Sequence, residues 1–265
     1  MSSLEPVPVF LGQVMKQISP ILLLTACVKP NGMPQTAIKF VDERLRQYRE
    51  SLNFYLAKTN FDVVFCENTG MDISEHYEKE IQKGRLEVLT YEGNDFDKIK
   101  GKGYGECQIV AHALQHSQKL KQASMYQPVV KISGRHIVRN IKSIVNFTNL
   151  FIGKKSTFVC AHINNRTKGA ISDFYIGTLN FHQLFINNQS EIDESKGVWY
   201  EHVLFSTMEE YYHNKKGEVL NLPVPLYQIG VSGSTGEPFI RPSYKDYMKS
   251  ILKCIAYKTG MLKID

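Results

Sequence analysis

The apolar run PILLLTACV, residues 20–28, is followed directly by KPNGMP, a stretch rich in turn formers. A short apolar run bounded by turn residues is consistent with a strand that is buried on both faces of a sheet. Residues 36–59 then carry apolar side chains at helical spacing, and FDVVFCENTG at residues 61–70 is a second buried run that ends in a polar loop. The order strand, helix, strand predicts an α/β fold with a parallel sheet.

The same alternation continues along the chain. We expect further strands at residues 86–91, 127–138 and 156–164, of which the second is interrupted by a polar turn. A helix that runs to about residue 121 follows the first of them, and a mixed segment at residues 174–186 and a basic amphipathic helix at residues 243–262 come later. No repeat, low-complexity segment or long linker divides them. The sequence therefore predicts a single α/β domain over residues 1–265, with a core at about residues 20–240 and a mostly parallel central sheet flanked by helices.

Length and composition limit the class of protein. At 265 residues and 43 % hydrophobic content, the chain can bury one substantial core. A formal charge of +6 and a pI near 8.9 imply an anionic partner, which can be nucleotide phosphates, an anionic membrane surface or nucleic acid. The apolar runs are too short to span a bilayer, and residues 1–10 lack the pattern of a signal peptide. We therefore expect the chain to remain in the cytoplasm.

The stretch GKGYGECQIVAHALQHS, residues 101–117, places three glycines, a lysine and a glutamate before an apolar helical pattern. In the functional interpretation, the backbone of Gly103 and Gly105 approaches a diphosphate, because bare N–H groups at the positive end of a helix can meet an anion. Lys102 then neutralises the charge, and Glu106 holds a hydroxyl group or a neighbouring cation. A tight turn and an ordinary helix start explain the same residues.

Cationic groups follow the predicted fourth strand, at the end where ligands sit in open α/β sheets. The segment VVKISGRHIVRN carries Lys131, Ser133, Gly134 and Arg135 there. Arginine can grip phosphate through two parallel hydrogen bonds, so Arg135 is a candidate anion-binding residue. A structural salt bridge is the alternative.

The single tryptophan, Trp199, stands shortly before Glu201 and His202, ahead of an apolar helical pattern. A carboxylate in this place could act as a general base, with its pKa raised by an aromatic surround. A partly buried glutamate that caps a helix is the competing explanation.

The segment GVSGSTGEPF, residues 230–239, is a flexible loop rich in glycine and hydroxyl groups. Its Ser232, Gly233, Ser234 and Thr235 could fold over a bound phosphate and supply N–H and O–H donors. An ordinary surface turn is the alternative.

Two motifs could in principle bind metal ions. The aspartates of NDFD, residues 94–97, have D-x-D spacing, but no buried strand leads directly into them, which favours a solvated turn. His112 and His116 form a helical pair that lacks the glutamate and the third ligand of a zinc site. No metal ligand is therefore predicted.

The segments FDVVFCENTG, GKGYGE, VVKISGRHIV, SDFYIGTLNF, WYEH and GVSGSTG, in this order, resemble the nucleotide-diphospho-sugar transferase fold of the GT-A type. The resemblance covers residues 21–239 and is strongest to bacterial glycosyltransferases of capsular and lipopolysaccharide assembly. It implies transfer of a sugar from a nucleotide-diphospho-sugar donor to a glycan or a lipid-linked acceptor.

The resemblance also implies roles on the donor side. The end of the first strand and the acidic residue of the second usually hold the base and ribose in that fold, which here are Thr25, Ala26 and Glu67. SGR, residues 133–135, lies where such enzymes commonly carry a metal-binding D-x-D. The resemblance therefore implies that its arginine and Lys131 replace the cation. No cofactor is firmly predicted, and Mn²⁺ or Mg²⁺ stays open as an alternative.

On the acceptor side, the resemblance implies that Asp173 faces the acceptor. WYEH resembles a W-x-E-D-like signature of many inverting members, which makes Glu201 the general base, and His202 stands where many members have aspartate. The base would deprotonate the acceptor hydroxyl while positive charge steadies the departing diphosphate.

The expected partners are the nucleotide-sugar donor, the acceptor and the cytoplasmic face of the inner membrane, with no nucleic acid. The lysines of the C-terminal helix that could meet anionic headgroups are Lys245, Lys249, Lys253 and Lys258. A helix that simply covers the core is the alternative for this segment. Two other functions stay open, a sugar-phosphate nucleotidyltransferase and a non-catalytic module that binds nucleotides or anions.

Overall fold

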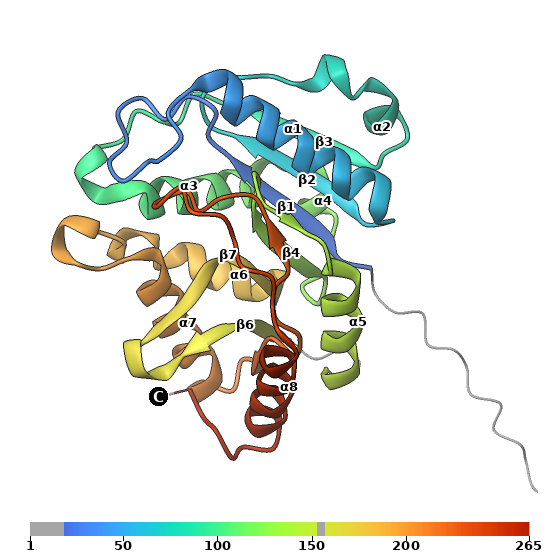
Figure 1. The fold of residues 1–265 in the computed structure, drawn as a ribbon, viewed down its shortest axis with the longest axis vertical. Coiled ribbons are helices and arrows are strands. Elements are labelled where there is room, and N and C mark those ends of the chain that lie inside the picture. The colour runs from blue at the N-terminus through green and yellow to red at the C-terminus, as the bar shows by residue number, and fades with distance from the viewer. Residues whose placement is uncertain (1–18, 153–156, 265) are drawn as a thin grey trace, which may run out of the picture.

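A computed structural model describes residues 19–152 and 157–264 around a seven-stranded sheet (Figure 1). The order across the sheet is β3, β2, β1, β4, β7, β6, β8. These strands are β1 (Ile21–Ala26), β2 (Asp62–Glu67), β3 (Leu86–Thr90), β4 (Pro128–Ser133), β6 (Phe158–Asn164), β7 (Gly169–Thr178) and β8 (Glu218–Asn221). Neighbouring strands are parallel except at β7, which runs antiparallel to β4 and β6. The predicted mostly parallel sheet is confirmed.

Helices flank this sheet, as the sequence predicts (Figure 1). They are α1 (Val41–Lys58), α2 (Glu78–Gln82), α3 (Gly101–His116), α4 (Gln118–Lys121), α5 (Ile141–Phe151), α6 (Leu179–Asn187), α7 (Tyr200–His213) and α8 (Tyr244–Lys258). Within residues 19–152 and 157–264, none of them combines the length and the apolar character that crossing a membrane requires. The predicted α/β fold class with a C-terminal helix is confirmed.

Strand β1 explains how the core is divided, because all six of its residues are buried. Successive side chains of a strand point to opposite faces of the sheet. Leu22 and Leu24 accordingly belong to one apolar cluster with Leu52 of α1, whereas Leu23 belongs to a second cluster with Val110 of α3. The apolar run that predicts the fold is therefore buried between helices on both faces.

Several boundaries differ from the sequence prediction. The fourth strand ends at Ser133, and β5 (Ile137–Val138) leaves the main sheet to pair with β9 (Gln228–Ile229). The helix expected to run to about residue 121 ends at His116, because Ser117 caps the separate α4 by accepting a hydrogen bond from Leu120 N. Helix α5 and strand β8 were not predicted from the sequence.

The predictions of no signal peptide and of a single domain stay predictions. The absence of a signal peptide was inferred from residues 1–10, which lie outside the described residues. The single domain over residues 1–265 includes these and stays a prediction.

Candidate functional site

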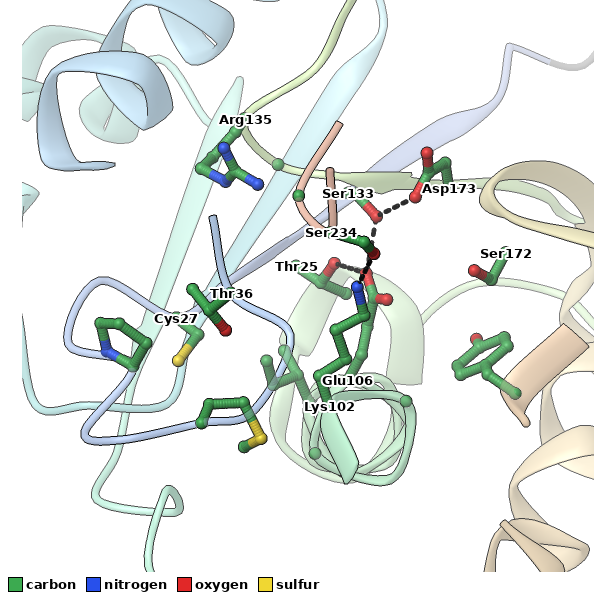
Figure 2. A pocket seen from close by; sticks show the side chains of 18 of the residues that line it. Thr25, Cys27, Thr36, Lys102, Glu106, Ser133, Arg135, Ser172, Asp173 and Ser234 are labelled. Carbon is green, nitrogen blue, oxygen red and sulfur yellow. Dashed lines mark hydrogen bonds between the residues drawn. The ribbon is translucent and has the colours of Figure 1, made fainter. Parts of the chain in front are cut away.

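A cavity of about 440 Å³ opens at the carboxyl ends of β1 and β4 (Figure 2). This is the edge of an open α/β sheet where ligands bind, and the volume lies in the range of small-molecule sites. Because β7 is antiparallel to β4, it brings its early residues Ile171, Ser172 and Asp173 to the same edge. The first turns of α3 and α7, the loop after β1 and the loop at residues 232–234 are also part of the lining.

Most residues predicted for the site line this cavity. Those that do are Thr25, Ala26, Lys102, Gly103, Gly105, Glu106, Ser133, Gly134, Arg135, Asp173, Glu201, Ser232, Gly233 and Ser234. Those that do not are Glu67, Lys131, His202 and Thr235. The structure therefore gathers segments that lie more than two hundred positions apart along the chain, and it separates four residues from them.

A hydrogen-bonded network of Thr25, Glu106, Lys131 and Ser133, here called the floor, lies beneath the cavity. Glu106 Oε1 accepts hydrogen bonds from Lys131 Nζ at 2.7 Å, Thr25 Oγ1 at 2.8 Å and Ser133 Oγ at 2.8 Å. Figure 2 shows this carboxylate between Thr25 and Ser133. Glu106 was predicted to hold a hydroxyl group or a cation. In the structure it binds two hydroxyl groups and one ammonium group, and all three belong to the protein itself.

Lys131 is fully buried, and its ammonium group also donates to Ser172 O at 2.6 Å. Burial by itself raises the pKa of Glu106, but the charge of Lys131 and the hydrogen bonds from Lys131, Ser133 and Thr25 outweigh it, so the pKa is lowered. Lys131 does not line the cavity and forms a salt bridge with Glu106, as the structural alternative expects, and its role beside the donor stays a prediction.

Glu67 also binds the chain itself and not the cavity. It is fully buried, and its carboxylate accepts hydrogen bonds from the backbone N–H groups of Val28 at 2.9 Å, Thr69 at 2.8 Å and Met71 at 2.9 Å. It therefore joins the loops that follow β1 and β2. Asn68, the next residue, lines the cavity in its place.

The glycine-rich stretch lies inside helix α3, which begins at Gly101, so the expectation that the glycines precede the helix is wrong. Gly101 has a φ of 84°, and a Cβ there would collide with the side chain of Glu194. At Gly103 a Cβ would lie 3.0 Å from Tyr200 Cβ and 3.1 Å from Glu194 Oε1. The groups that approach this backbone are thus side chains of the protein.

Glu194, in the short η5 helix (Glu194–Lys196), holds the start of α3. Its Oε1 accepts a hydrogen bond from Gly103 N at 2.9 Å, which places a carboxylate where a phosphate was predicted. Burial raises the pKa of Glu194, and the charge of Glu201 adds to this rise. Nothing in its polar stretch of sequence indicates this contact, because it joins positions about ninety residues apart.

Arg135 and Lys102 supply cationic groups to the cavity wall. Arg135 donates from Nη1 to Gln47 Oε1 at 2.8 Å, which leaves other N–H groups of its guanidinium for a ligand. Lys102 Nζ donates to Ser234 Oγ, which joins α3 to the loop predicted to cover a phosphate (Figure 2). Thr235 in that loop does not line the cavity, and its backbone N–H donates to Ser232 Oγ at 3.2 Å.

Two carboxylates keep unused acceptor capacity at the cavity. Glu201, in the first turn of α7, accepts a hydrogen bond from Ser172 Oγ. Asp173 Oδ1 lies 3.4 Å from Ser133 Oγ. A carboxylate can accept about four hydrogen bonds, so both can still bind substrate hydroxyl groups.

His202 does not share this position. Its Nδ1 accepts a hydrogen bond from Trp199 N at 3.3 Å, so its ring caps the start of α7. His202, predicted as a catalytic residue, does not line the cavity in this structure, and its catalytic role stays a prediction.

The cavity also contains residues that were not predicted from the sequence as site residues. His136 follows Arg135 directly, and Trp199 and Tyr200 directly precede the predicted base Glu201. Arg44 donates from Nε to Cys27 O at 2.8 Å and so braces the loop after β1. Position after a strand could have indicated His136, whereas Arg44 sits in a helix with no local signal.

The residues present do not fit a divalent metal ion. The end of β4 carries Ser133 and Arg135 in place of two carboxylates. Asp97, in the D-x-D-like loop, instead accepts a hydrogen bond from Ile99 N at 3.1 Å and caps a short 3₁₀ helix. Within residues 19–152 and 157–264, no group of three or more His, Cys, Asp and Glu side chains is placed to hold a metal ion.

No family model and no curated protein matches the chain. Its fold is similar to that of a Desulfovibrio desulfuricans G20 protein described as a nucleotide-diphospho-sugar transferase, with 12 % identity over 77 % of this chain and 79 % of that one and a TM-score of 0.40. Mouse xyloside xylosyltransferase 1 has 11 % identity over 78 % and 87 % of the two chains and a TM-score of 0.41. A cytidylyltransferase from Leptospira borgpetersenii serovar Hardjo-bovis has 14 % identity over 91 % and 87 % and a TM-score of 0.42. At these scores the reaction must be argued from the site itself.

Proposed function

We propose that the protein is a glycosyltransferase that moves a sugar from a nucleotide-diphospho-sugar to a glycan or lipid-linked acceptor in surface polysaccharide biosynthesis, without a divalent metal. The observation that carries the proposal is one cavity at the carboxyl ends of parallel strands with Arg135 and Lys102 on its wall and two carboxylates with spare acceptor capacity. Group transfer from a diphosphate needs both kinds of group.

On the donor side, the diphosphate leaves with negative charge that must be stabilised. Arg135 offers N–H groups in a fork that fits phosphate oxygens, and Lys102 with Ser234 closes the other wall. The arginine then takes the place of the metal ion, for which the end of β4 has no ligands.

On the acceptor side, Glu201 is the general base that removes the proton from the attacking hydroxyl group. Its hydrogen bond from Ser172 holds the carboxylate while leaving lone pairs for the acceptor. Asp173 is the second candidate, since it lines the same cavity. A base that takes this proton directly fits an inverting transfer.

A thermal-shift screen tests the donor class first. The purified chain is melted with UDP, GDP, CMP and their sugar conjugates, each with EDTA and with Mn²⁺, since a ligand at 100 times its Kd adds about 2.7 kcal/mol of stability. We expect one nucleotide and its sugar conjugate to raise Tm in EDTA, and Arg135→Met to remove most of the shift.

Product analysis then separates the functions. Release of the nucleotide diphosphate with sugar transfer in EDTA supports the proposal. Strict metal dependence with formation of a nucleotide sugar from a sugar phosphate would indicate a nucleotidyltransferase instead. Tight binding without turnover on any acceptor would indicate a binding module.

We also propose that α8 rests on the anionic cytoplasmic face of the inner membrane. Tyr244, Met248, Leu252 and Ile255 are all exposed, Tyr244 by 79 % and Leu252 by 61 %. Their spacing forms one apolar stripe along the helix. An exposed stripe of this kind fits the acyl boundary of a bilayer.

The charges beside this stripe argue for a lipid surface. Lys245 and Lys249 are exposed, whereas Lys253 donates to Ile163 O and Lys258 pairs with Glu218. Only the first two of the four predicted lysines are therefore free for headgroups. We expect flotation with vesicles that contain phosphatidylglycerol, loss of flotation in Leu252→Asp, and no change in Ile99→Asp, which alters an exposed apolar residue outside the stripe. Equal flotation of Leu252→Asp and the wild type would contradict this.

A further inference from the structure

His136 is a buried histidine with no hydrogen-bond partner for its ring. The residue is 2 % exposed, it lines the cavity, and neither Nδ1 nor Nε2 has a partner among the described residues. Leaving a buried polar group without a hydrogen bond costs free energy. A ligand in the cavity can satisfy this ring, because the cavity is where the side chain lies.

The neighbours of the ring come from several elements. Asp173 of β7 is closest among the charged groups, with Oδ2 at 3.7 Å from Nδ1. Phe239 packs edge-on at 4.9 Å between ring centroids. The backbone carbonyl of His136 is fixed to α1 by Ser51 Oγ at 3.0 Å and Tyr55 OH at 2.9 Å. The ring is therefore held in place beside one carboxylate.

The cavity has no surplus of positive charge for an anionic ligand. The cationic side chains that line it are Arg44, Lys102 and Arg135, and the anionic ones are Glu106, Asp173, Glu194 and Glu201. Lys131 beneath the cavity balances Glu106. A diphosphate that enters thus meets a formally neutral lining, and an added proton would supply the positive charge that is missing.

We propose that His136 takes up a proton from solvent when the cavity binds the diphosphate group of its ligand. One ring N–H then donates to a phosphate oxygen, and the other faces Asp173, which stabilises the imidazolium. The step forms one N–H bond on the ring with a proton released by the buffer, and no bond of the ligand breaks. The inference rests on the proposed function and deepens it, because it names how the site gains charge without a metal.

The electrostatics of the empty cavity fit this coupling. Burial lowers the pKa of His136, with Arg135 and Lys131 acting in the same direction and Asp173 and Glu106 opposing them. These contacts therefore favour the neutral form of the ring before the ligand arrives. A bound anion raises this pKa, so affinity increases as pH falls through the pKa of the complex and levels off below the pKa of the free protein.

Calorimetry measures the proton directly. UDP and GDP are titrated in EDTA at pH 6, 7 and 8, each in two buffers of different ionisation enthalpy, with wild type and His136→Gln. Subtracting the uptake of His136→Gln cancels the titration of the nucleotide itself. At pH 7 we expect the wild type to take up more protons than His136→Gln, by roughly half a proton for each nucleotide bound, and the affinity ratio to grow about tenfold from pH 8 to pH 6.

Matched variants locate the proton. His116→Gln removes a histidine that is exposed on α3 outside the cavity and should keep the wild-type uptake. Uptake that survives in His136→Gln but vanishes in Glu194→Gln would overturn the proposal, since Glu194 would then be the acceptor. If His136→Gln does not fold, His136→Asn takes its place in the subtraction, and an uptake equal to that of the wild type would overturn the proposal equally.

The failures of the two proposals are distinguishable. If neither nucleotide nor any sugar conjugate binds, the transferase proposal fails, and inorganic pyrophosphate is titrated instead. Pyrophosphate binding with His136-dependent uptake supports the inference alone. Pyrophosphate binding without uptake that depends on His136 overturns the inference, and so does the absence of binding of any of these anions.

Discussion

The floor and the rim of the cavity both contain carboxylates and basic side chains, but these have many partners in the floor and few in the rim. In the floor, Glu106 accepts three short hydrogen bonds from the protein and faces a fully buried Lys131. We use "rim" for Arg135, His136, Asp173 and Glu201, whose polar atoms have few or no partners. A carboxylate with several hydrogen-bond partners from the protein stabilises the fold, whereas one with few partners can bind a substrate. The number of partners, and not the residue type, separates the two roles.

The largest effect is expected for the rim base. Glu201→Gln should lower turnover by about 10²–10⁴-fold, because an amide cannot accept the proton of the acceptor hydroxyl. The measurement is the rate of diphosphate release with the donor found in the screen. The free energy of unfolding of Glu201→Gln should differ from that of the wild type by less than about 0.5 kcal/mol, as for most surface substitutions.

Asp173→Asn serves as the comparison for that prediction. If Asp173→Asn loses the greater part of the activity and Glu201→Gln keeps it, the base is Asp173. In that case the comparison between floor and rim stands, but the assignment of Glu201 does not.

Breaking the floor should cost stability. Glu106→Gln leaves the Lys131 charge unpaired, and we expect a loss of about 3 kcal/mol, the lower end for a broken buried pair because Glu106 is partly exposed. Urea unfolding at pH 7 measures it. The lowered pKa of Glu106 means that its contribution is complete above the unfolded pKa of about 4.3 and is lost as pH falls through the lower folded value. The gap in stability between wild type and Glu106→Gln should therefore close in acid.

A double variant controls for the loss of packing. Glu106→Gln with Lys131→Met removes both charges and should recover part of the lost stability. If the double variant is as unstable as the sum of the two single variants, the ion pair is not what holds the floor.

A smaller effect is expected for the arginine of the rim. Arg135→Met should weaken nucleotide diphosphate binding by about 1.5–3 kcal/mol, which is the cost of a lost hydrogen bond to a charged group. Binding of the bare nucleoside should change little, since the guanidinium is proposed to face phosphate. Calorimetry in EDTA measures both. Equal losses for nucleoside and nucleotide would place Arg135 at the base or ribose.

The smallest effect is expected for His202, the residue after the proposed base Glu201. His202→Ala removes the ring that accepts from Trp199 N and should cost about 1 kcal/mol of stability through the lost cap. Turnover per folded molecule should stay within twofold or so of wild type, because the ring does not line the cavity. A loss of turnover comparable to that of Glu201→Gln would restore His202 as a site residue.

Local patterns predicted the layers of this fold, and most of the residues predicted for the site line the cavity. The buried run at β1, the helical spacing of α1 and the buried run at β2 indicate a parallel sheet, and the sheet places the ends of its strands at one edge. Thr25, Ser133 and Arg135 were found by this rule alone. The rule fails for Glu67, because position after a strand does not reveal that backbone N–H groups already saturate its carboxylate.

The sequence by itself determined the α/β class, the cationic groups after β4 and a carboxylate in the first turn of α7, because each follows from periodicity or from position within a few residues. Only the tertiary structure decided which charges are neutralised. Lys131 meets Glu106 from another element, Glu194 fills the start of α3 from a distant loop, and the ring of His136 is left without a hydrogen-bond partner among the described residues. Such contacts join residues that are far apart along the chain, so no local pattern specifies them.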